Sequence, residues 1–344
     1  MNTIFVSIAS YRDENCPKTL GSLFENAKYP DRIFVGICQQ NKENDIQCIP
    51  KNFPYIKNIR IIQKKYSDAK GPTWARYLCA TLYKNEDFFL QVDSHSLFVE
   101  DWDIKCIEMI ESLEKSPEVE NKKVMLSHYP PSYHNYEKNP SNEKITTMVE
   151  CFFNNDGIIS FKGAQWRKPG PLPRRNIFIA GGFIFCRGKW LEEVPFDPHL
   201  KYLFVGEEIL ITIRSYTSGW DVYTPNKNIV YHFYTRPKDP KIWKDLMYSN
   251  NEVKQKVKII CKLDNDLSKL TTKEIYNSLI DYNIGKERTL EEFYDFIGVD
   301  IKKKTIGKPK IEFYIDKNYN TTGNHIILSL FFLFLIILLM KKYN

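Results

Sequence analysis

The strongest constraint on the fold is a regular alternation of short apolar runs and amphipathic segments over the first 130 residues. The apolar runs have the length and composition of buried strands, and the segments between them carry apolar residues at helical spacing. The expected strands cover residues 4–9, 33–38, 59–63, 88–92 and 124–128, and the expected helices begin near Pro17, Thr73 and Ile104. This order predicts an α/β fold with a mostly parallel central sheet and flanking helices.

The pattern is less regular in the rest of the chain. Residues 129–175 show no clear periodicity, which indicates a long loop region of the kind that forms lids or acceptor surfaces. Further elements are expected as a strand at 177–185, a helix at 207–215 and a strand at 229–234. Residues 238–300 are expected to be helical, with Trp243, Leu246 and Phe293 as packing residues.

Composition and charge place the chain among globular proteins. Its 344 residues are enough for one large domain or two modest ones, and 43% of them are hydrophobic. The net charge of +7 is mild for this length. It favours anionic donors or acidic lipid surfaces, but without a concentrated basic arm it does not indicate a nucleic-acid partner.

The eight cysteines include no CxxC pair, and several of them lie in apolar runs, as Cys186 does. The N-terminus has no signal-peptide pattern, because its apolar run is short and charged residues follow at once. A disulfide framework requires an oxidising compartment. We therefore expect the cysteines to be mostly reduced core residues.

A run of 15 uncharged, apolar residues covers positions 326–340 and is followed by two lysines. As a helix it would rise roughly 22 Å, which is short of a bilayer core of about 30 Å unless flanking residues extend it. A buried core helix is the alternative. Because the run is apolar on all sides, we expect a single-pass tail anchor with the catalytic part in the cytosol. The predicted organisation is a catalytic domain at 1–300, a polar linker at 301–325 and the anchor.

The most specific local motif is Asp93-Ser94-His95, directly after an apolar strand. Residues i and i+2 of an extended segment point to the same side, so the Asp93 carboxylate and the His95 imidazole can reach one divalent ion. Such a pair suits Mn²⁺ or Zn²⁺, and added diphosphate oxygens favour Mn²⁺ or Mg²⁺. Taken alone the triplet is weak evidence, because most Asp residues in such positions form caps or turns.

Several other polar positions have both an ordinary and a functional interpretation. Glu207 and Glu208 open a predicted helix, where acids are favoured by the helix dipole, but a carboxylate there can also hold sugar hydroxyls. Gly181-Gly182 is either a turn or a place where the backbone approaches a ligand closely. The remaining candidates, each ordinary when read alone, are the histidine in an apolar run and two arginines: His232, Arg76 and Arg236.

In this order the residues resemble a known family, the N-acetylglucosaminyltransferases of glycosyltransferase family sixty. The resembling segments are IFVSIASYRD at 4–13, GPTWARYLCATLY at 71–83, FFLQVDSHSLFVEDWD at 88–103 and YNIGKERTLEEFYDFIGV at 282–299. The chain is more distantly similar to the polypeptide N-acetylgalactosaminyltransferases. That similarity lies in the D-x-H motif, the Gly181-Gly182 turn, the G-E-x at 206–208 and His232.

The resemblance implies a GT-A type fold and a UDP-sugar donor, with GlcNAc as the sugar and a retained anomeric configuration. It also implies Mn²⁺ or Mg²⁺ as cofactor and a hydroxyl acceptor on a protein, such as hydroxyproline, or on a glycan. The metal ligands that it implies are Asp93, His95 and His232.

The same resemblance implies the donor contacts. Arg76 and Arg236 would approach the nucleotide or diphosphate, although Arg236 lies farther from the histidine than its counterpart in the galactosaminyl relatives. Glu207 and Arg236 are the expected catalytic residues. The residues expected to line the donor sugar and the nucleoside are Gly181, Gly182, Glu207, Ser10 and Arg12, and Asp93 also belongs to the donor site.

Two other classes of protein remain open from the sequence. One is a sugar-binding or nucleotide-binding scaffold that keeps the fold without turnover, against which the intact Asp93, His95 and His232 count. The other is a metal-dependent hydrolase, which no H-E-x-x-H or similar spacing supports.

Overall fold

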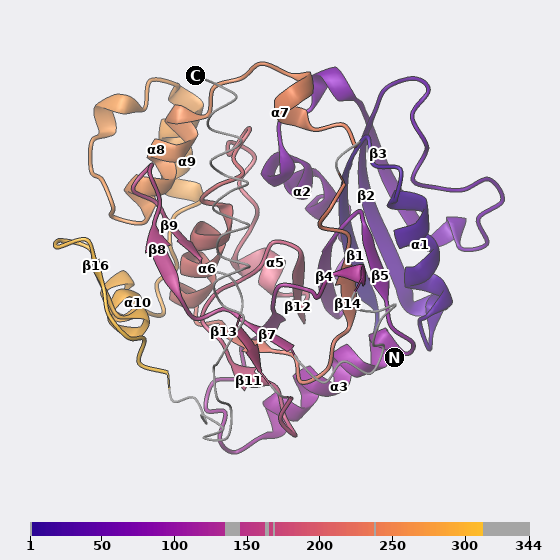
Figure 1. The fold of residues 1–344 in the computed structure, drawn as a ribbon, viewed down its shortest axis with the longest axis horizontal. Helices are drawn as coiled ribbons and strands as arrows, with labels where there is room; N and C mark the ends of the chain where they lie inside the picture. Colours follow the sequence, from indigo (N-terminus) through magenta and orange to yellow (C-terminus); the bar gives the residue numbers. More distant parts are fainter. Residues whose placement is uncertain (1, 135–144, 162–164, 168, 237–238, 312–344) are drawn as a thin grey trace. The chain divides into compact units, whose positions relative to one another are not determined.

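The computed structural model describes residues 2–134, 145–161, 165–167, 169–236 and 239–311 (Figure 1). The chain divides into two compact units, Met1–Pro309 and Lys310–Asn344. All elements given below belong to the first unit. The predicted linker at 301–325 and the boundary at 300 stay predictions.

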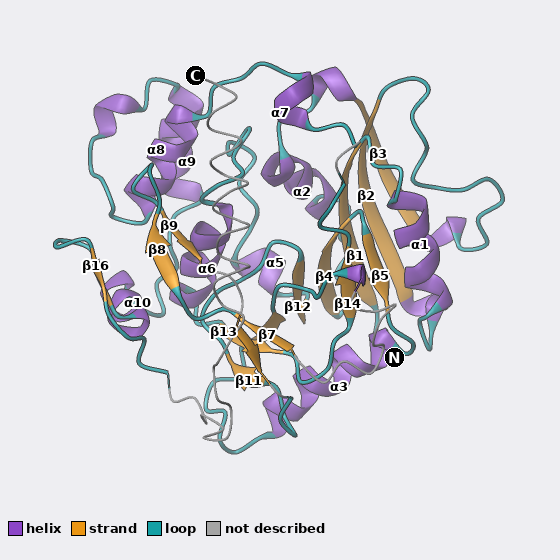
Figure 2. Ribbon diagram, in the orientation of Figure 1, coloured by secondary structure: helices purple, strands orange, loops and turns teal. Residues whose placement is uncertain are grey.

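An eight-stranded sheet forms the centre of this unit (Figure 2). Its strands are ordered β11-β13-β6-β12-β4-β1-β2-β3. Their bounds are Ile4–Tyr11 for β1, Ile33–Asn41 for β2, Ile59–Lys65 for β3, Phe88–Asp93 for β4, Val124–Ser127 for β6, Arg174–Arg175 for β11, Phe183–Arg187 for β12 and Asp221–Thr224 for β13.

The sheet is mostly parallel, as the strand–helix alternation predicts. Strands β3, β2, β1 and β4 pair in parallel with one another, and β6 pairs in parallel with β13. Only β12, between β4 and β6, and the edge strand β11 run the other way. The carboxyl ends of β1, β2 and β4 therefore meet at one edge, where ligands of such sheets bind.

Helices cover both faces of the sheet, and the residues of β1 alternate between them. Ile4, Val6 and Ile8 pack with α1 (Cys16–Glu25) and α3 (Trp102–Lys115). Phe5 instead packs in a second cluster with Trp190 of α5 (Trp190–Glu193) and with α6 (Glu207–Thr217). Helix α2 (Pro72–Ala80) lies on the side of β1 and β2 opposite to α1 (Figure 2). Strands buried on both faces explain why their sequences are continuously apolar.

The part after 238 is mainly helical, as predicted. It contains α7 (Ile242–Asp245), α8 (Asn251–Ile260), α9 (Lys273–Asp281) and α10 (Leu290–Ile297), followed by a hairpin of β15 (Val299–Asp300) and β16 (Thr305–Ile306). Phe293 is fully buried, but the expected packing role of Trp243 is wrong, because 49% of its surface is exposed. Leu246, directly after α7, is half-buried.

Two segments differ from the sequence-based expectation. The expected long loop at 129–175 contains short strands in addition to β11: β7 (Ile145–Thr147), β8 (Cys151–Phe153), β9 (Ile159–Phe161) and β10 (Gln165–Arg167). The strand expected at 177–185 begins only at Phe183. The apolar residues before it are buried, but their N–H groups do not form a continuous strand ladder: Ile179 N–H donates to Thr212 Oγ1, Ala180 N–H to Ser127 Oγ and Phe178 N–H to the Met148 carbonyl.

The cysteines follow the expectation except for one pair. Six of them are free and buried, but Cys16 and Cys48 form a disulfide. This pair arises because the loop after β2 folds back onto the start of α1, with 4.8 Å between the two Cα atoms.

Within the described residues, no helix has both the length and the apolar character needed to cross a membrane. The expected anchor at 326–340 lies outside these residues, and its membrane insertion stays a prediction.

Candidate metal and donor site

The three expected metal ligands lie together. Asp93 ends β4, and His95 immediately precedes the short strand β5 (Ser96–Phe98). Strand β14 (Val230–His232) is not part of the main sheet but pairs with β5 in a separate two-stranded sheet. His232 is in register with Ser96, which places its ring next to that of His95, with 4.5 Å between the ring centroids.

The donor atoms of this cluster suit a first-row divalent ion. One ligand atom from each of Asp93, His95 and His232 lies within 4.8 Å of the others. His95 uses Nδ1 in a hydrogen bond to Asp13, so its Nε2 is the nitrogen left for an ion. The buried Nδ1 of His232 has no hydrogen-bond partner, and Nε2 lies 3.1 Å from Asp93 Oδ2. One carboxylate and two imidazoles fit Mn²⁺ or Zn²⁺ and leave coordination positions for a ligand.

Arg76 of α2 connects Asp93 to Glu207 of α6. Its guanidinium donates to Glu207 Oε1 and, at 3.0 Å, to Asp93 Oδ1, and only 7% of the residue is exposed. Burial alone would lower the pKa of Arg76, but the charges of Glu207 and Asp93 outweigh it and raise the pKa. Burial likewise opposes ionisation of Asp93, but the hydrogen bond from His232 and the charge of Arg76 lower its pKa well below the usual range. The site therefore holds charged groups inside a mostly buried setting.

Gly181 and Gly182, directly before β12, lie against this network. A Cβ at Gly181 would lie 2.8 Å from Arg76 Nη1, and one at Gly182 would lie 3.1 Å from Asp93 Oδ2. A side chain at either position would thus displace a charged group of the site. The Gly181 N–H donates to Glu208 Oε1 at 2.9 Å, and the Gly181 carbonyl accepts from the Gln91 amide at 2.7 Å. The turn is consequently held by its neighbours on both sides.

The two acids that begin α6 have different surroundings. Burial raises the pKa of Glu207, and the charge of Arg76 opposes this. Burial raises the pKa of Glu208 to about 7, although Tyr129 donates to its carboxylate at 2.6 Å. Glu207 is thus joined to the metal cluster through Arg76, whereas Glu208 supports the Gly181 turn.

Asp13, in the loop after β1, joins Arg236 to the same cluster. Its Oδ2 accepts from His95 Nδ1 at 2.7 Å and from Arg236 Nη1 at 3.1 Å. Burial would raise the pKa of Asp13, but the hydrogen bond and charge of His95, together with Arg236, lower it to about 2. The structure thereby brings Arg236 next to the metal residues in spite of its unusual spacing in sequence.

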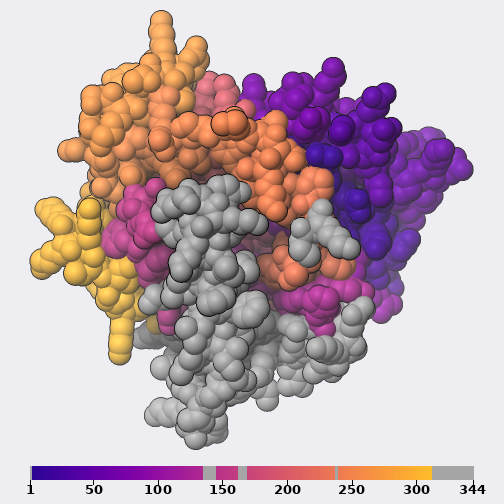
Figure 3. Space-filling model, turned by 45° about the horizontal axis from the view of Figure 1, so that its top comes forward, coloured from indigo at the N-terminus to yellow at the C-terminus, as the bar shows by residue number. Residues whose placement is uncertain are grey.

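Ser10 and Arg12 lie at the carboxyl end of β1, on the same edge of the sheet. The Ser10 hydroxyl is buried and has no hydrogen-bond partner. Arg12 forms ion pairs with Asp45 at 2.8 Å and with Asp245 of α7 at 2.9 Å. Figures 1 and 3 show the resulting proximity of the orange segment around α7 to the indigo N-terminal part. Helix α7 therefore borders the loop that carries Arg12.

Sequence reasoning missed three residues of this neighbourhood: Asp13, Tyr129 and Asp245. Asp13 was detectable in principle, since it is the first carboxylate after a strand that ends at the ligand-binding edge. Tyr129 and Asp245 come from irregular segments far away in sequence, and no local pattern identifies them.

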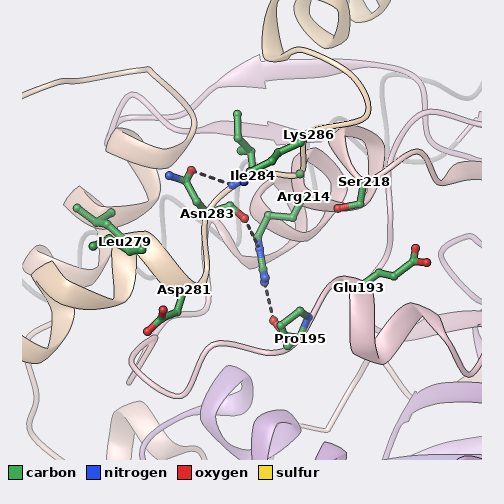
Figure 4. A pocket seen from close by; sticks show the side chains of 11 residues that line it. Glu193, Pro195, Arg214, Ser218, Leu279, Asp281, Asn283, Ile284 and Lys286 are labelled. Carbon is green, nitrogen blue, oxygen red and sulfur yellow. Dashed lines mark hydrogen bonds between the residues drawn. The ribbon is translucent and has the colours of Figure 1, made fainter.

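A separate cavity of about 620 Å³ lies at the other end of α6 (Figure 4). Arg214 lines it and donates to the carbonyls of Asn283 and Pro195. None of the metal or donor residues discussed above lines this cavity.

The sequence matches the model of a protein family. The model of the glycosyltransferase (GlcNAc) family matches residues 3–56 and 50–303, which together are well over half of the chain. The chain belongs to the glycosyltransferase (GlcNAc) family. All of the metal and donor residues described above lie within the matched part. A comparison with curated protein sequences finds no significant match.

Two solved structures are similar to this chain to different degrees. The structure of GalNAc-T7 with UDP, GalNAc and Mn²⁺ is similar, with a TM-score of 0.56 and 14% identity. The similarity covers 88% of this chain but only 58% of that chain, so this chain spans less than two thirds of the relative's length. S. aureus TarS 1–349 in complex with UDP-GlcNAc has a TM-score of 0.45 and 16% identity, over 82% of this chain and 73% of that one. The likeness to GalNAc-T7 supports a GT-A-like fold and nothing finer.

Proposed function

We propose that the protein is a retaining glycosyltransferase that moves GlcNAc from UDP-GlcNAc to a hydroxyl group with the help of Mn²⁺ or Mg²⁺. The observation that carries the proposal is the convergence of Asp93, His95 and His232 beside the buried Arg76. Membership in the glycosyltransferase (GlcNAc) family and the resemblance to family sixty support the choice of sugar. The fold shared with GalNAc-T7, which is seen with UDP and Mn²⁺, supports the choice of nucleotide and ion.

Sugar transfer from UDP requires stabilisation of the negative charge that builds on the leaving diphosphate. Asp93, His95 and His232 would hold a divalent ion, which would supply this stabilisation as a positive charge beside the diphosphate. Arg236 lies beside this cluster through Asp13 and is available to pair with the diphosphate. Retaining transfer of this kind need not use a strong general base, so the proposal does not require a catalytic acid–base pair.

The remaining donor residues have complementary tasks in this proposal. Glu207 accepts sugar hydroxyls at the start of α6, and Gly181 with Gly182 lets the donor approach the backbone closely. The buried, unpartnered Ser10 hydroxyl and the Arg12 loop are suited to the nucleoside at the carboxyl end of β1. The acceptor is a protein side chain such as hydroxyproline, or a glycan, and the C-terminal run at 326–340 anchors the enzyme to a membrane.

The direct test is a screen of UDP-sugars for UDP release in the presence of Mn²⁺, Mg²⁺ or a chelator, followed by mass analysis of candidate acceptors. We expect release from UDP-GlcNAc with Mn²⁺ and none with chelator. UDP-GlcNAc binding without release or transfer, across all acceptors and ions tried, would instead indicate a sugar-nucleotide-binding scaffold. Release that is unaffected by chelator would remove the metal from the proposal.

A further inference from the structure

Asp13 is a buried carboxylate with an unusual concentration of donors. Only 3% of the residue is exposed. Its Oδ2 accepts from Ser94 Oγ at 2.6 Å, from His95 Nδ1 at 2.7 Å and from Arg236 Nη1 at 3.1 Å. Its Oδ1 accepts from the backbone N–H of Asn15 at 2.9 Å. Both oxygens are therefore satisfied, as a buried charge requires.

This arrangement determines which nitrogen of His95 carries the proton. An ionised carboxylate can only accept hydrogen bonds, so the 2.7 Å contact requires a proton on His95 Nδ1. The neutral ring then has its lone pair on Nε2, the nitrogen that does not contact Asp13. A histidine that binds a metal through one nitrogen commonly donates the other N–H to a carboxylate, which fixes both the tautomer and the ring orientation.

We propose that Asp13 is a positioning residue of the metal site, which holds His95 with Nε2 facing the ion and holds Arg236 beside it. The inference rests on the proposed function, since it assumes that His95 is a metal ligand. Asp13 comes from the loop after β1, whereas His95 follows β4 and Arg236 follows β14. One carboxylate thus joins the segment after β14, which lies outside the eight-stranded sheet, to the neighbouring ends of β1 and β4.

A purely structural role for Asp13 makes different predictions. If the carboxylate only stabilised the fold, its replacement would lower stability without changing the tautomer of His95 or the intrinsic affinity for an ion. Asp103 offers a matched control, because it is equally buried at 2% exposure and accepts backbone N–H groups from Lys28 and Tyr29. It lies on α3 and has no contact with the metal residues among its hydrogen bonds.

The test compares the full-length wild type with Asp13→Asn and Asp103→Asn. The first readout is the ¹⁵N NMR signal of the His95 ring in the metal-free protein, assigned with His95→Gln. The second is the affinity for Mn²⁺ alone, measured by electron paramagnetic resonance without donor. We expect a proton on Nδ1 in the wild type, a changed tautomer balance in Asp13→Asn, and an Mn²⁺ affinity about 10–100-fold weaker in that variant only.

Each outcome distinguishes this inference from the proposed function. Wild-type binding of Mn²⁺ together with an Asp13→Asn affinity within about twofold of it would overturn the positioning role and leave the metal site standing. A wild type that binds no Mn²⁺ would overturn the metal site itself. If Asp13→Asn does not fold, the wild-type NMR spectrum still tests the positioning role of Asp13. A proton on His95 Nε2 in the metal-free protein contradicts that role.

Discussion

Replacing Arg76 by Ala should destabilise the protein strongly, because its guanidinium is buried between two carboxylates. Arg76 bonds Glu207 and Asp93, whose side chains are 11% and 28% exposed. Removing one partner of a buried ion pair costs about 3–5 kcal/mol, since a charge is left buried without compensation. Asp93 is the more exposed of the two, so we expect Arg76→Ala to lower the free energy of unfolding by about 3 kcal/mol at neutral pH.

The loss of stability caused by Arg76→Ala should depend on pH. Burial already raises the pKa of Glu207, and removal of Arg76 raises it further because the opposing positive charge is gone. A carboxyl group whose pKa is higher in the folded than in the unfolded protein contributes stability below the unfolded pKa and loses it as pH rises through the folded pKa. Asp93 also loses the Arg76 charge that holds its pKa down, and with it stability at neutral pH. The destabilisation by Arg76→Ala should therefore be larger at pH 7.5 than at pH 5.

Urea unfolding of wild type, Arg76→Ala and Arg76→Lys at both pH values measures these effects. Lys115→Ala is the control, because Lys115 pairs with Glu111 on an exposed helix surface, with its side chain 75% exposed. Such a pair contributes about 0.3–0.5 kcal/mol. Arg76→Lys keeps the charge but reaches a single carboxylate, so its loss should be intermediate. If Arg76→Ala costs as little as Lys115→Ala at pH 7.5, the buried network does not stabilise this protein.

Three further predictions concern function. Glu207→Gln should leave UDP binding nearly intact and lower the rate of transfer by about 10–100-fold, because one charge-assisted hydrogen bond is lost. Glu208→Gln should lower the rate of transfer less. Equal and small effects of both changes would remove both acids from the donor site. His232→Ala should abolish Mn²⁺-dependent UDP release while the circular dichroism spectrum stays that of the wild type, and full turnover in this variant would exclude His232 as a ligand. Removal of residues 326–344 should release an active enzyme from membranes, and a truncated protein that still pellets after carbonate washing would contradict the tail anchor.

The strands were predictable where the apolar residues are buried and their backbone groups also bond to a neighbouring strand. Strands β1, β2 and β4 are largely buried and paired along their length, so their apolar runs predict both their position and their parallel pairing. The run at 177–182 is just as apolar, but its backbone bonds to side chains such as those of Thr212 and Ser127. A hydrophobicity pattern reports burial and not the identity of the hydrogen-bond partner, so it cannot separate these two cases.

The sequence predicted that Asp93, His95 and His232 lie together, but not how the fold brings them together. The D-x-H spacing places Asp93 and His95 together because it is local. The position of His232 depends on the pairing of β14 with β5, a three-residue contact between distant segments that has no periodic signal. The same holds for Arg236, whose place beside the cluster depends on Asp13 rather than on its distance from His232 in sequence.

The charges of the site explain why an ion and a nucleotide should bind together. The carboxylates joined in this network outnumber its guanidinium groups by two: Asp13, Asp93, Glu207 and Asp239 against Arg76 and Arg236. An anionic diphosphate would therefore meet a site with an excess of carboxylates in a partly buried setting, where repulsion is weakly screened. A divalent cation would offset this excess and offer coordination positions to the diphosphate. By linkage, the nucleotide must tighten ion binding by the same factor by which the ion tightens nucleotide binding.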